Sequence, residues 1–386
     1  MQITRSNVEA LFEPDLITEI IEGVVAQSAV LSRFRRLPNM STNKTKMRVL
    51  DALPMAYWVD ADTNNGRKKL TKMAWDNKYI TAEELAVIVP IKEDLLADAD
   101  YDLWGDIRPR IVEAIHKKID DAVITGTDKP KGFRTDLLTS ILNAGANVPY
   151  TADQTLYSAV NDAMAKVEES GYNVTGVIGG VDVKSKFRML LDTNGQPIAG
   201  TEIGDLVKNA VYVSTGAWDK SKSRLIVGDF TQAVYSIRQD VTYKLLDQAV
   251  IQDPATGEIL YNLAQDDMVA LRVVMRLGWE IPNPINALSP DEATRFPFAS
   301  LDPQNASTLT TQTVTITVKD NQGTPVAIKD AKVTVGGLSK KTNASGVATF
   351  KLQAGDYAAL VKKDGMVAME AITVAGAAVN KTITLK

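Results

Sequence analysis

Hydrophobic residues follow a helical period through one long stretch in the first half of the chain. Between residues 102 and 125 apolar side chains recur at every third or fourth position, and charged side chains occupy the opposite face. The apolar stripe consists of Trp104, Ile107, Ile111, Ile115, Ile119 and Val123. This pattern predicts one amphipathic helix, about 30 Å long, that ends at Gly126. Because Pro109 lacks a backbone donor, we expect the helix to begin within one turn of it.

The other segments of the first 300 residues mix helical and strand periods. Residues 14–31, 154–171 and 181–191 predict helices. Apolar or alternating runs predict strands at residues 47–50, 56–59, 86–91, 174–178, 210–213, 224–227, 233–237 and 268–277. Residues 44–91 are interpreted as a two-stranded excursion with a polar tip at residues 60–66. This part of the chain is therefore assigned to the α+β class.

Beyond residue 300 the pattern changes to strands alone. A polar connector that contains a proline, residues 302–308, precedes the alternating segments 314–318, 331–335, 347–352, 357–361 and 381–385. Glycine, asparagine and aspartate separate these segments at the spacing of short turns. We therefore predict two domains, residues 1–300 and residues 301–386, of which the second is a small antiparallel β-sandwich.

The composition removes several classes of chemistry. The 386 residues include no cysteine and one histidine, His116, so thiolate metal sites, redox cysteine pairs and multi-histidine clusters are excluded. Of the 43 basic and 47 acidic residues, residues 301–386 hold 10 and 6, which leaves 33 and 41 for residues 1–300. Neither part has the polycationic character of a nonspecific nucleic-acid binder. No apolar stretch reaches the ~18 residues of a membrane span, so we expect no membrane partner.

Three features suggest chemistry at first and then lack its essential parts. Residues 60–66 begin with oxygen ligands at alternating positions, as in a calcium loop, but Asn65 and Thr71 replace the required glycine and glutamate. Residues 177–180 favour a tight strand-to-helix connection over a phosphate-binding loop. His116 is interpreted as a half-exposed helical side chain. We therefore predict no catalytic, cofactor-binding or metal-binding residues, and a protein that is not an enzyme.

Two dense basic clusters lie next to aromatic residues. Basic and aromatic side chains together on an extended arm are typical of contacts between protein subunits. The aromatic members are expected to be exposed on the folded chain. The candidates for subunit contacts are Arg33, Phe34, Arg35, Arg36, Tyr57, Trp58, Arg67, Lys68, Lys69, Lys72 and Trp75.

Three stretches carry a family resemblance through their content and their order. Residues 56–59 precede a charged hairpin, residues 102–133 combine the long helix with a Gly-x-x-x-Pro-x-Gly turn that begins at Gly126, and residues 265–287 form a final strand. Together they resemble the extended loop, spine helix and closing strand of tailed-bacteriophage major capsid proteins of the Hong Kong 97 type. The turn phrases of the last 80 residues, among them the segment 342–352, resemble bacterial and phage immunoglobulin-like repeats.

The resemblance implies a Hong Kong 97-like capsid fold followed by an all-β immunoglobulin-like sandwich. The sandwich, residues 301–386, is expected to be a surface-exposed appendage that shells do not need. In the shell domain, 1–300, the implied parts are an N-terminal arm (1–40), an extended loop (41–92), the spine helix with part of the peripheral domain (93–139), an axial domain (140–240) and a return to the peripheral domain (241–300).

The implied function is structural. The family assembles from many copies of one chain, as pentamers and hexamers, into an icosahedral head that encloses double-stranded DNA without sequence-specific contacts. The implied further partners are a scaffolding protein, a portal and a maturation protease, and the implied location is the virion, assembled in the bacterial host cytoplasm. No cofactor is implied.

Two alternatives stay open from the sequence. One keeps the shell fold but makes it an encapsulin-type bacterial nanocompartment around an enzyme cargo. The other, from a different class, is a carbohydrate-active enzyme that carries an immunoglobulin-like module.

Overall fold

The fold is that of a computed structural model. It describes residues 28–54, 56, 68, 70–71, 73–94, 103–133, 135–190, 210–213, 217–289, 292, 295–303, 311–321 and 326–385. The chain divides into two compact units whose segments alternate along the sequence. Unit 1 draws on Met1–Thr45, Ile80–Asp120 and Val234–Glu280, and unit 2 on Lys46–Tyr79, Asp121–Ala233 and Ile281–Lys386. Of the helix predicted at residues 14–31, only residues 28–31 are described.

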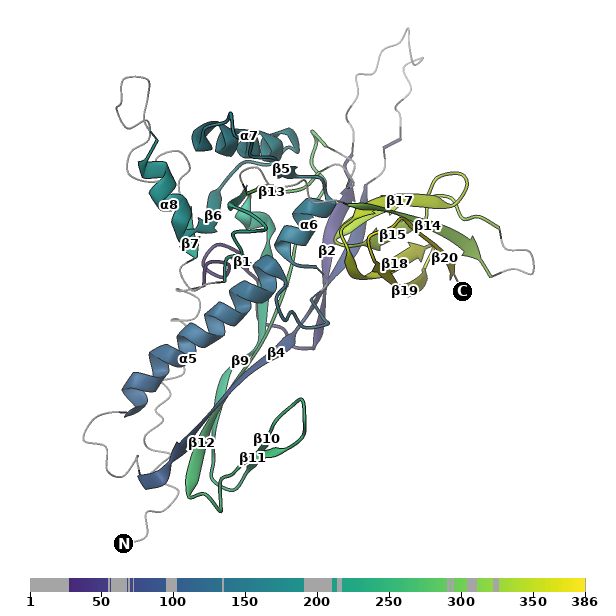
Figure 1. Ribbon diagram of the computed structural model, residues 1–386. Helices are drawn as coiled ribbons and strands as arrows, with labels where there is room; N and C mark the ends of the chain where they lie inside the picture. The colour runs from purple at the N-terminus through teal and green to yellow at the C-terminus, as the bar shows by residue number, and fades with distance from the viewer. Residues whose placement is uncertain are drawn as a thin grey trace. The chain divides into compact units, whose positions relative to one another are not determined.

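Unit 1 is built on a sheet of four strands in the order β1-β9-β12-β4 (Figure 1). The strands are β1 (Arg35–Arg36), β4 (Glu83–Lys92), β9 (Val234–Leu246) and β12 (Met268–Glu280), and the hairpin β10 (Val250–Gln252) with β11 (Ile259–Asn262) follows β9. β12 pairs antiparallel with both β4 and β9. Most side chains of β12 are buried, which explains its nearly continuous apolar sequence. The strands predicted at 86–91, 233–237 and 268–277 are confirmed.

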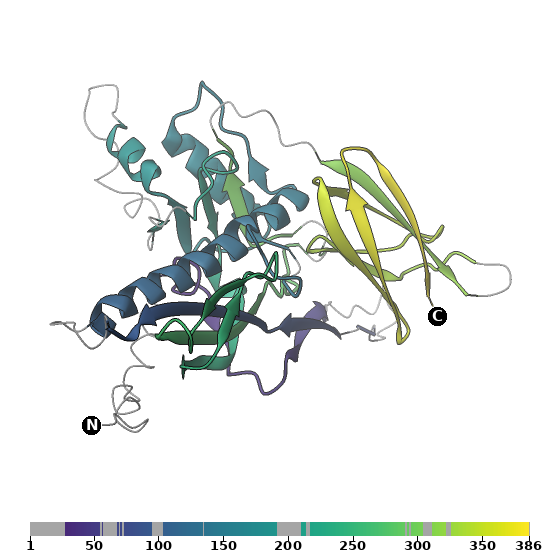
Figure 2. The same ribbon diagram turned by 60° about the horizontal axis from the view of Figure 1, so that its bottom comes forward.

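The long helix α5 (Leu103–Asp120) contacts β4 and continues directly into a π-helical turn, η1 (Asp121–Thr125) (Figure 2). The predicted stripe is buried at its four later positions, Ile111, Ile115, Ile119 and Val123. The predicted start is wrong, because Pro109 lies inside the helix. The proline removes one early hydrogen bond, and burial of the stripe that follows outweighs this loss.

His116 is buried, contrary to the expectation of a half-exposed side chain. Only 3% of its surface is accessible, and its Nδ1 lies 2.8 Å from the carbonyl oxygen of Val112. Val112 is buried as well, so the buried face of α5 is wider than the isoleucine stripe. The histidine is therefore a packed core residue, and its ring is hydrogen-bonded to the backbone of the preceding turn of its own helix.

The last residue of α5, Asp120, holds the chain that precedes β1. Its carboxylate accepts hydrogen bonds from the Ser28 hydroxyl at 2.6 Å and from the backbone amides of Ala29 and Val30 at 3.0 and 3.2 Å. Burial raises the pKa of Asp120 above its ordinary value despite these donors. The segment before β1 is thereby attached to the end of the helix.

Unit 2 contains a mixed sheet in the order β5-β13-β8-β6-β7. Its strands are β5 (Asn147–Val148), β6 (Gly176–Gly180), β7 (Ala210–Val213), β8 (Leu225–Gly228) and β13 (Phe298–Leu301). Helices α7 (Leu156–Glu169) and α8 (Val181–Arg188) lie beside this sheet (Figure 1). They supply side chains such as Val160 and Phe187 to its core. The helices and strands predicted between residues 154 and 227 are confirmed. At Gly180, β6 passes directly into α8, which is the tight connection expected there.

Two smaller parts of the fold position the site described below. β2 (Lys44–Ala52) and β3 (Ala74–Thr81) pair as a two-stranded ribbon, most of which belongs to unit 2. This confirms the strand predicted at residues 47–50, but its partner β3 was not predicted, and residues 86–91 pair with β12 instead. Residues 57–59 of the predicted strand 56–59 and the predicted tip at residues 60–66 lie outside the described residues. The pattern did not predict the helix α6 (Leu137–Asn143). Its N-cap is Asp136, whose side chain accepts a hydrogen bond from the Thr139 amide.

The described residues beyond 310 form a sandwich of two sheets, β17-β14-β20 and β16-β15-β18-β19 (Figure 2). The strands are β14 (Gln312–Asp320), β15 (Lys332–Val335), β16 (Leu338–Lys341), β17 (Val347–Leu352), β18 (Gly355–Lys363), β19 (Met366–Val374) and β20 (Val379–Leu385). Side chains from both sheets share one core, among them Ile316, Val333 and Phe350. The five predicted strands are confirmed, and β16 and β19 are additional.

The strand order of the sandwich differs from that of an immunoglobulin constant-type domain. In such a domain the first, second, fifth and fourth strands share one sheet, whereas here the first strand, β14, lies between β17 and β20. β14 and β20 run parallel, so the expectation of a purely antiparallel sandwich is wrong. The error has a simple cause, because parallel and antiparallel neighbours show the same alternation of buried and exposed residues.

Replacement of Ile115 by aspartate is expected to prevent soluble folding. Ile115 is 2% exposed, and an unpaired buried carboxylate costs several kcal/mol against a total stability of about 5–15 kcal/mol. The matched control is Ala114→Asp, which places the same side chain at an exposed position of the same helix. Soluble yield and thermal unfolding measure the difference, and equal behaviour of the two variants would contradict the burial of the stripe.

Candidate functional site

The first group of predicted contact residues lies in unit 1 around β1. Arg35 and Arg36 are exposed, and Arg33 is half-buried. Phe34 is 5% exposed and its ring lies 6.0 Å from that of Trp279. The expectation of an exposed Phe34 is therefore wrong, since the ring fills the core of its own chain and is not free to meet a neighbouring subunit.

The second group lies on and near the ribbon in unit 2. Trp75, on β3, is 60% exposed, and Lys68 is exposed. Both therefore have the exposure that a subunit contact requires. The remaining candidates of this group, Tyr57, Trp58, Arg67, Lys69 and Lys72, lie outside the described residues.

Two groups stand out among the exposed apolar side chains that the sequence reasoning missed. In unit 1 they lie on the hairpin of β10 and β11, at Val250, Ile259, Leu260 and Tyr261; in unit 2 they accompany Trp75, at Leu70 and Met73. The signal was present on β11, because three consecutive large apolar residues in one short strand cannot all face the same core. Such patches on a soluble chain mark surfaces that meet another molecule.

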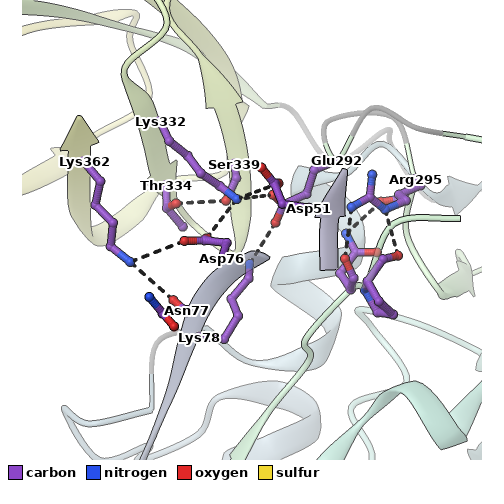
Figure 3. Close-up of polar contacts among 12 residues, drawn as sticks. Asp51, Asp76, Asn77, Lys78, Glu292, Arg295, Lys332, Thr334, Ser339 and Lys362 are labelled. Carbon is purple, nitrogen blue, oxygen red and sulfur yellow. Dashed lines mark hydrogen bonds and ion pairs between the residues drawn. The ribbon is translucent and has the colours of Figure 1, made fainter. Parts of the chain in front are cut away.

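A cluster of charged residues joins the sandwich to the base of the ribbon within unit 2 (Figure 3). Its central group is the ammonium of Lys332, at the start of β15. This nitrogen lies 2.9 Å from a carboxylate oxygen of Asp76, 2.9 Å from Glu292 and 3.3 Å from Asp51. Asp51 belongs to β2 and Asp76 to β3, so one lysine binds both strands of the ribbon.

Two more lysines complete what we call the charge cluster. Lys78 Nζ lies 2.8 Å from Glu292, and both side chains are about one-tenth exposed or less. Lys362 Nζ lies 3.9 Å from Asp76 and donates a hydrogen bond to the carbonyl oxygen of Asn77 at 3.3 Å. The charge cluster is thus Asp51, Asp76, Lys78, Glu292, Lys332 and Lys362, with three positive and three negative groups.

The register of the sandwich explains why carboxylates are needed here. Lys332 pairs directly with Lys341 on one side and with Lys362 on the other. Directly paired residues lie on the same face of a sheet, where like charges repel each other. Asp76 contacts both Lys332 and Lys362, and it therefore offsets the repulsion between these two.

Arg295 secures the chain near Glu292. It is 2% exposed, and its guanidinium donates hydrogen bonds at 3.1 Å to the carbonyl oxygens of both Asn283 and Pro284 (Figure 3). Asn283 in turn donates to the Arg295 carbonyl oxygen and accepts from the Tyr172 hydroxyl. Glu292 therefore lies close in sequence to residues that buried hydrogen bonds hold in place.

The pKa shifts in the cluster favour the charged form of every group for which a shift is resolved. Burial alone would raise the pKa of Asp76 and Glu292, but Lys332 beside both and Lys78 beside Glu292 hold these pKa values below the ordinary ones. Burial alone would lower the pKa of Lys332, yet Glu292 and Asp76 raise it. Because a nucleophilic amine needs a lowered pKa, Lys332 serves to hold charge partners and not to attack a substrate.

Sequence reasoning had no means of finding the charge cluster. Lys332 and Lys362 stand at polar positions of alternating strands, where a lysine is ordinary. Their partners are more than 200 residues away in the sequence, apart from Glu292.

Among the described residues, no helix is long and apolar enough to cross a membrane. Within that same part of the chain, no group of three or more acidic or histidine side chains is placed to hold a metal ion.

Comparison with known proteins places the chain in a family of shell-forming proteins. Residues 9–289 match the Phage capsid family, and the chain belongs to this family. It is similar to the major capsid protein of Staphylococcus phage 80alpha, with 25% identity over 270 residues that cover 69% of this chain and 80% of that protein.

Solved structures of phage proteins are similar to this chain in fold. One from Microbacterium phage Oxtober96 has a TM-score of 0.64 and 30% identity, and the match covers 78% of this chain and 100% of that chain. One from Mycobacterium phage Adephagia has a TM-score of 0.63 and 28% identity, over 80% of this chain and 99% of that chain. The family match ends at residue 289, before β13 and the sandwich.

Replacement of Lys332 by methionine is expected to destabilise unit 2 by about 3 kcal/mol. The substitution leaves Asp51 without the cation described for it, and it leaves Asp76 and Glu292 with one lysine each. Lys341→Met is the matched control, since Lys341 is the exposed neighbour of Lys332 in the same row of the sheet. A substitution at an exposed position of this kind changes the free energy of unfolding by about 0.5 kcal/mol or less. Denaturant unfolding of the full chain measures both, and equal midpoints would refute the pairing.

The stabilisation from the charge cluster is expected to depend on pH. The pKa values of Asp76 and Glu292 in the folded chain lie below the ordinary 3.8 and 4.5. Their contribution is therefore fully present above those values and is lost as the pH falls through the folded-state pKa. The difference in unfolding free energy between wild type and Lys332→Met is expected to be constant above about pH 5 and to shrink below about pH 4. A difference that grows on acidification would contradict this assignment.

Proposed function

We propose that this protein is the major shell protein of a tailed-bacteriophage head, whose copies assemble into an icosahedral capsid around double-stranded DNA. The observation that carries the proposal is the match of residues 9–289 to the Phage capsid family. The similarity to solved phage structures over about four-fifths of the chain supports it.

The exposed apolar residues support self-association as the mode of action. Trp75 is 60% exposed and Ile259 is 64% exposed, and they lie on a two-stranded ribbon and a two-stranded hairpin. Isolated two-stranded elements are marginally stable in water, so both elements gain most from contact with a neighbour. Permanent contacts of this kind bury more than about 2,000 Å² and are more apolar than transient ones.

The parts of the fold are assigned as in the Hong Kong 97 type. We take α5 as the spine helix, the ribbon as the base of the extended loop, and the four-stranded sheet of unit 1 as the peripheral domain. The five-stranded sheet of unit 2 is taken as the axial domain, near the centres of pentamers and hexamers. The sandwich is immunoglobulin-like in its two-sheet architecture, with the strand order described above.

The proposed partners follow from this role. The chain itself is the main partner, in pentamers and hexamers, and a scaffolding protein, a portal and a maturation protease act during assembly in the host cytoplasm. DNA is enclosed without sequence-specific contacts, which is consistent with 33 basic against 41 acidic residues in residues 1–300. The exposed positions Arg35, Arg36, Lys68 and Trp75 stay as candidates for subunit contacts.

Electron microscopy of the purified chain tests the proposal. The expected result is closed, uniform shells, formed by the chain alone or with scaffolding protein, that sediment as large particles. A chain that stays monomeric under all assembly conditions would refute it. Shells that co-purify with one enzyme instead of DNA would favour the nanocompartment.

A further inference from the structure

We propose that the C-terminal sandwich is a structural brace of the shell subunit, which fixes the base of the β2–β3 ribbon and is needed for correct assembly. The proposal rests on the capsid function above. It replaces the expectation of an appendage that shells can do without. The contacts that carry it all lie inside unit 2.

The brace acts through β15, which is held at both of its ends. At its first residue, Lys332 binds the carboxylates of Asp51, Asp76 and Glu292. Just after its last residue, the carbonyl oxygen of Gly336 accepts a hydrogen bond from the side chain of Asn143 at 3.2 Å. Two separated attachments prevent the rotation about a single point that one attachment would allow.

The second attachment, between α6 and the turn after β15, is buried and hydrogen-bonded. Asn143 is 5% exposed, and its side-chain oxygen accepts a hydrogen bond from the Gln353 amide at 3.2 Å. A Cβ at Gly336 would lie 2.8 Å from the Asn143 amide nitrogen, so the turn can approach α6 only because it lacks a side chain there. Ala144, which follows α6, packs against the core of the sandwich.

The ribbon needs such support because two strands do not define their own direction. A two-stranded element has no core of its own, and its orientation depends on what its base contacts. Lys332 binds both strands of that base, and Lys362 adds a second contact to β3. The sandwich therefore fixes the place from which the ribbon extends toward a neighbouring subunit.

Loss of the sandwich would leave the rest of the unit with several unsatisfied groups. Asp51 and Asp76 would lose the cations described for them, and Glu292 would keep Lys78 alone. Water would then reach these carboxylates, but three like charges would be left with one ammonium among them, and they would no longer hold the ribbon base in its present place. A detachable module joined only by a connector would have no such dependence.

Hydrogen exchange and assembly of full-length variants test the brace. Unassembled wild type, Lys332→Met and Lys341→Met are compared for exchange in peptides from 46–54 and 73–79, and then for shell formation by electron microscopy. Lys332→Met is expected to speed exchange at the ribbon base by about tenfold or more and to reduce the yield of closed shells severalfold. Lys341→Met is expected to match wild type in both.

The outcomes separate this proposal from the capsid function. Wild type that forms no shells, either alone or with scaffolding protein, would overturn the function itself. Wild type that forms shells, with Lys332→Met indistinguishable from Lys341→Met in exchange and in shell yield, would overturn the brace. If Lys332→Met does not fold, Lys362→Met replaces it, because Lys362 makes the weaker contact to β3 at 3.9 Å; unchanged exchange at 73–79 in that variant would equally overturn the brace.

Discussion

Six charged side chains can be shielded from water in one place only if their charges balance. In this chain three lysines meet three carboxylates, and each carboxylate has at least one ammonium within 4 Å. The balance has to be made in three dimensions, because the contributing strands β2, β3, β15 and β18 come from opposite ends of the sequence. The ribbon base, the chain near Glu292 and the sandwich therefore meet through one set of charge pairs.

Two kinds of stabilisation operate in the molecule, and they differ in how much geometry they demand. The isoleucine stripe of α5 is held by burial, which tolerates small changes of position. The charge cluster and the Asn143 amide require specific atoms within hydrogen-bond distance, and an error leaves an unsatisfied buried group. The first kind accounts for the existence of the elements, and the second accounts for their relative placement within unit 2.

Elements with a strong period were predictable, and the parts that depend on distant partners were not. The stripe from Ile111 to Val123 predicted α5, and alternation predicted β14 and β17, because each pattern is complete within one segment. β13 was missed because Phe298–Leu301 is a four-residue strand between partners about 75 and 150 residues away. His116 and Phe34 were misjudged because their burial is supplied by other segments. The role of Lys332 was not predictable for the same reason, because distant segments supply its partners and its neighbours in the sequence are those of an ordinary surface lysine.

The place of β13 in its sheet sets the order in which the chain can complete itself. β8 and β5 lie on either side of β13, so the five-stranded sheet stays open between these two strands until the ribosome has delivered residue 301. Between the synthesis of β8 and that of β13, a nascent chain therefore carries two strand edges that still lack their shared partner, and such edges invite wrong pairing between neighbouring chains. The sandwich follows β13 in the sequence, so it is synthesised after that strand. Synthesis itself thus delays the braced, assembly-ready subunit until the risk of misassociation through that sheet has passed.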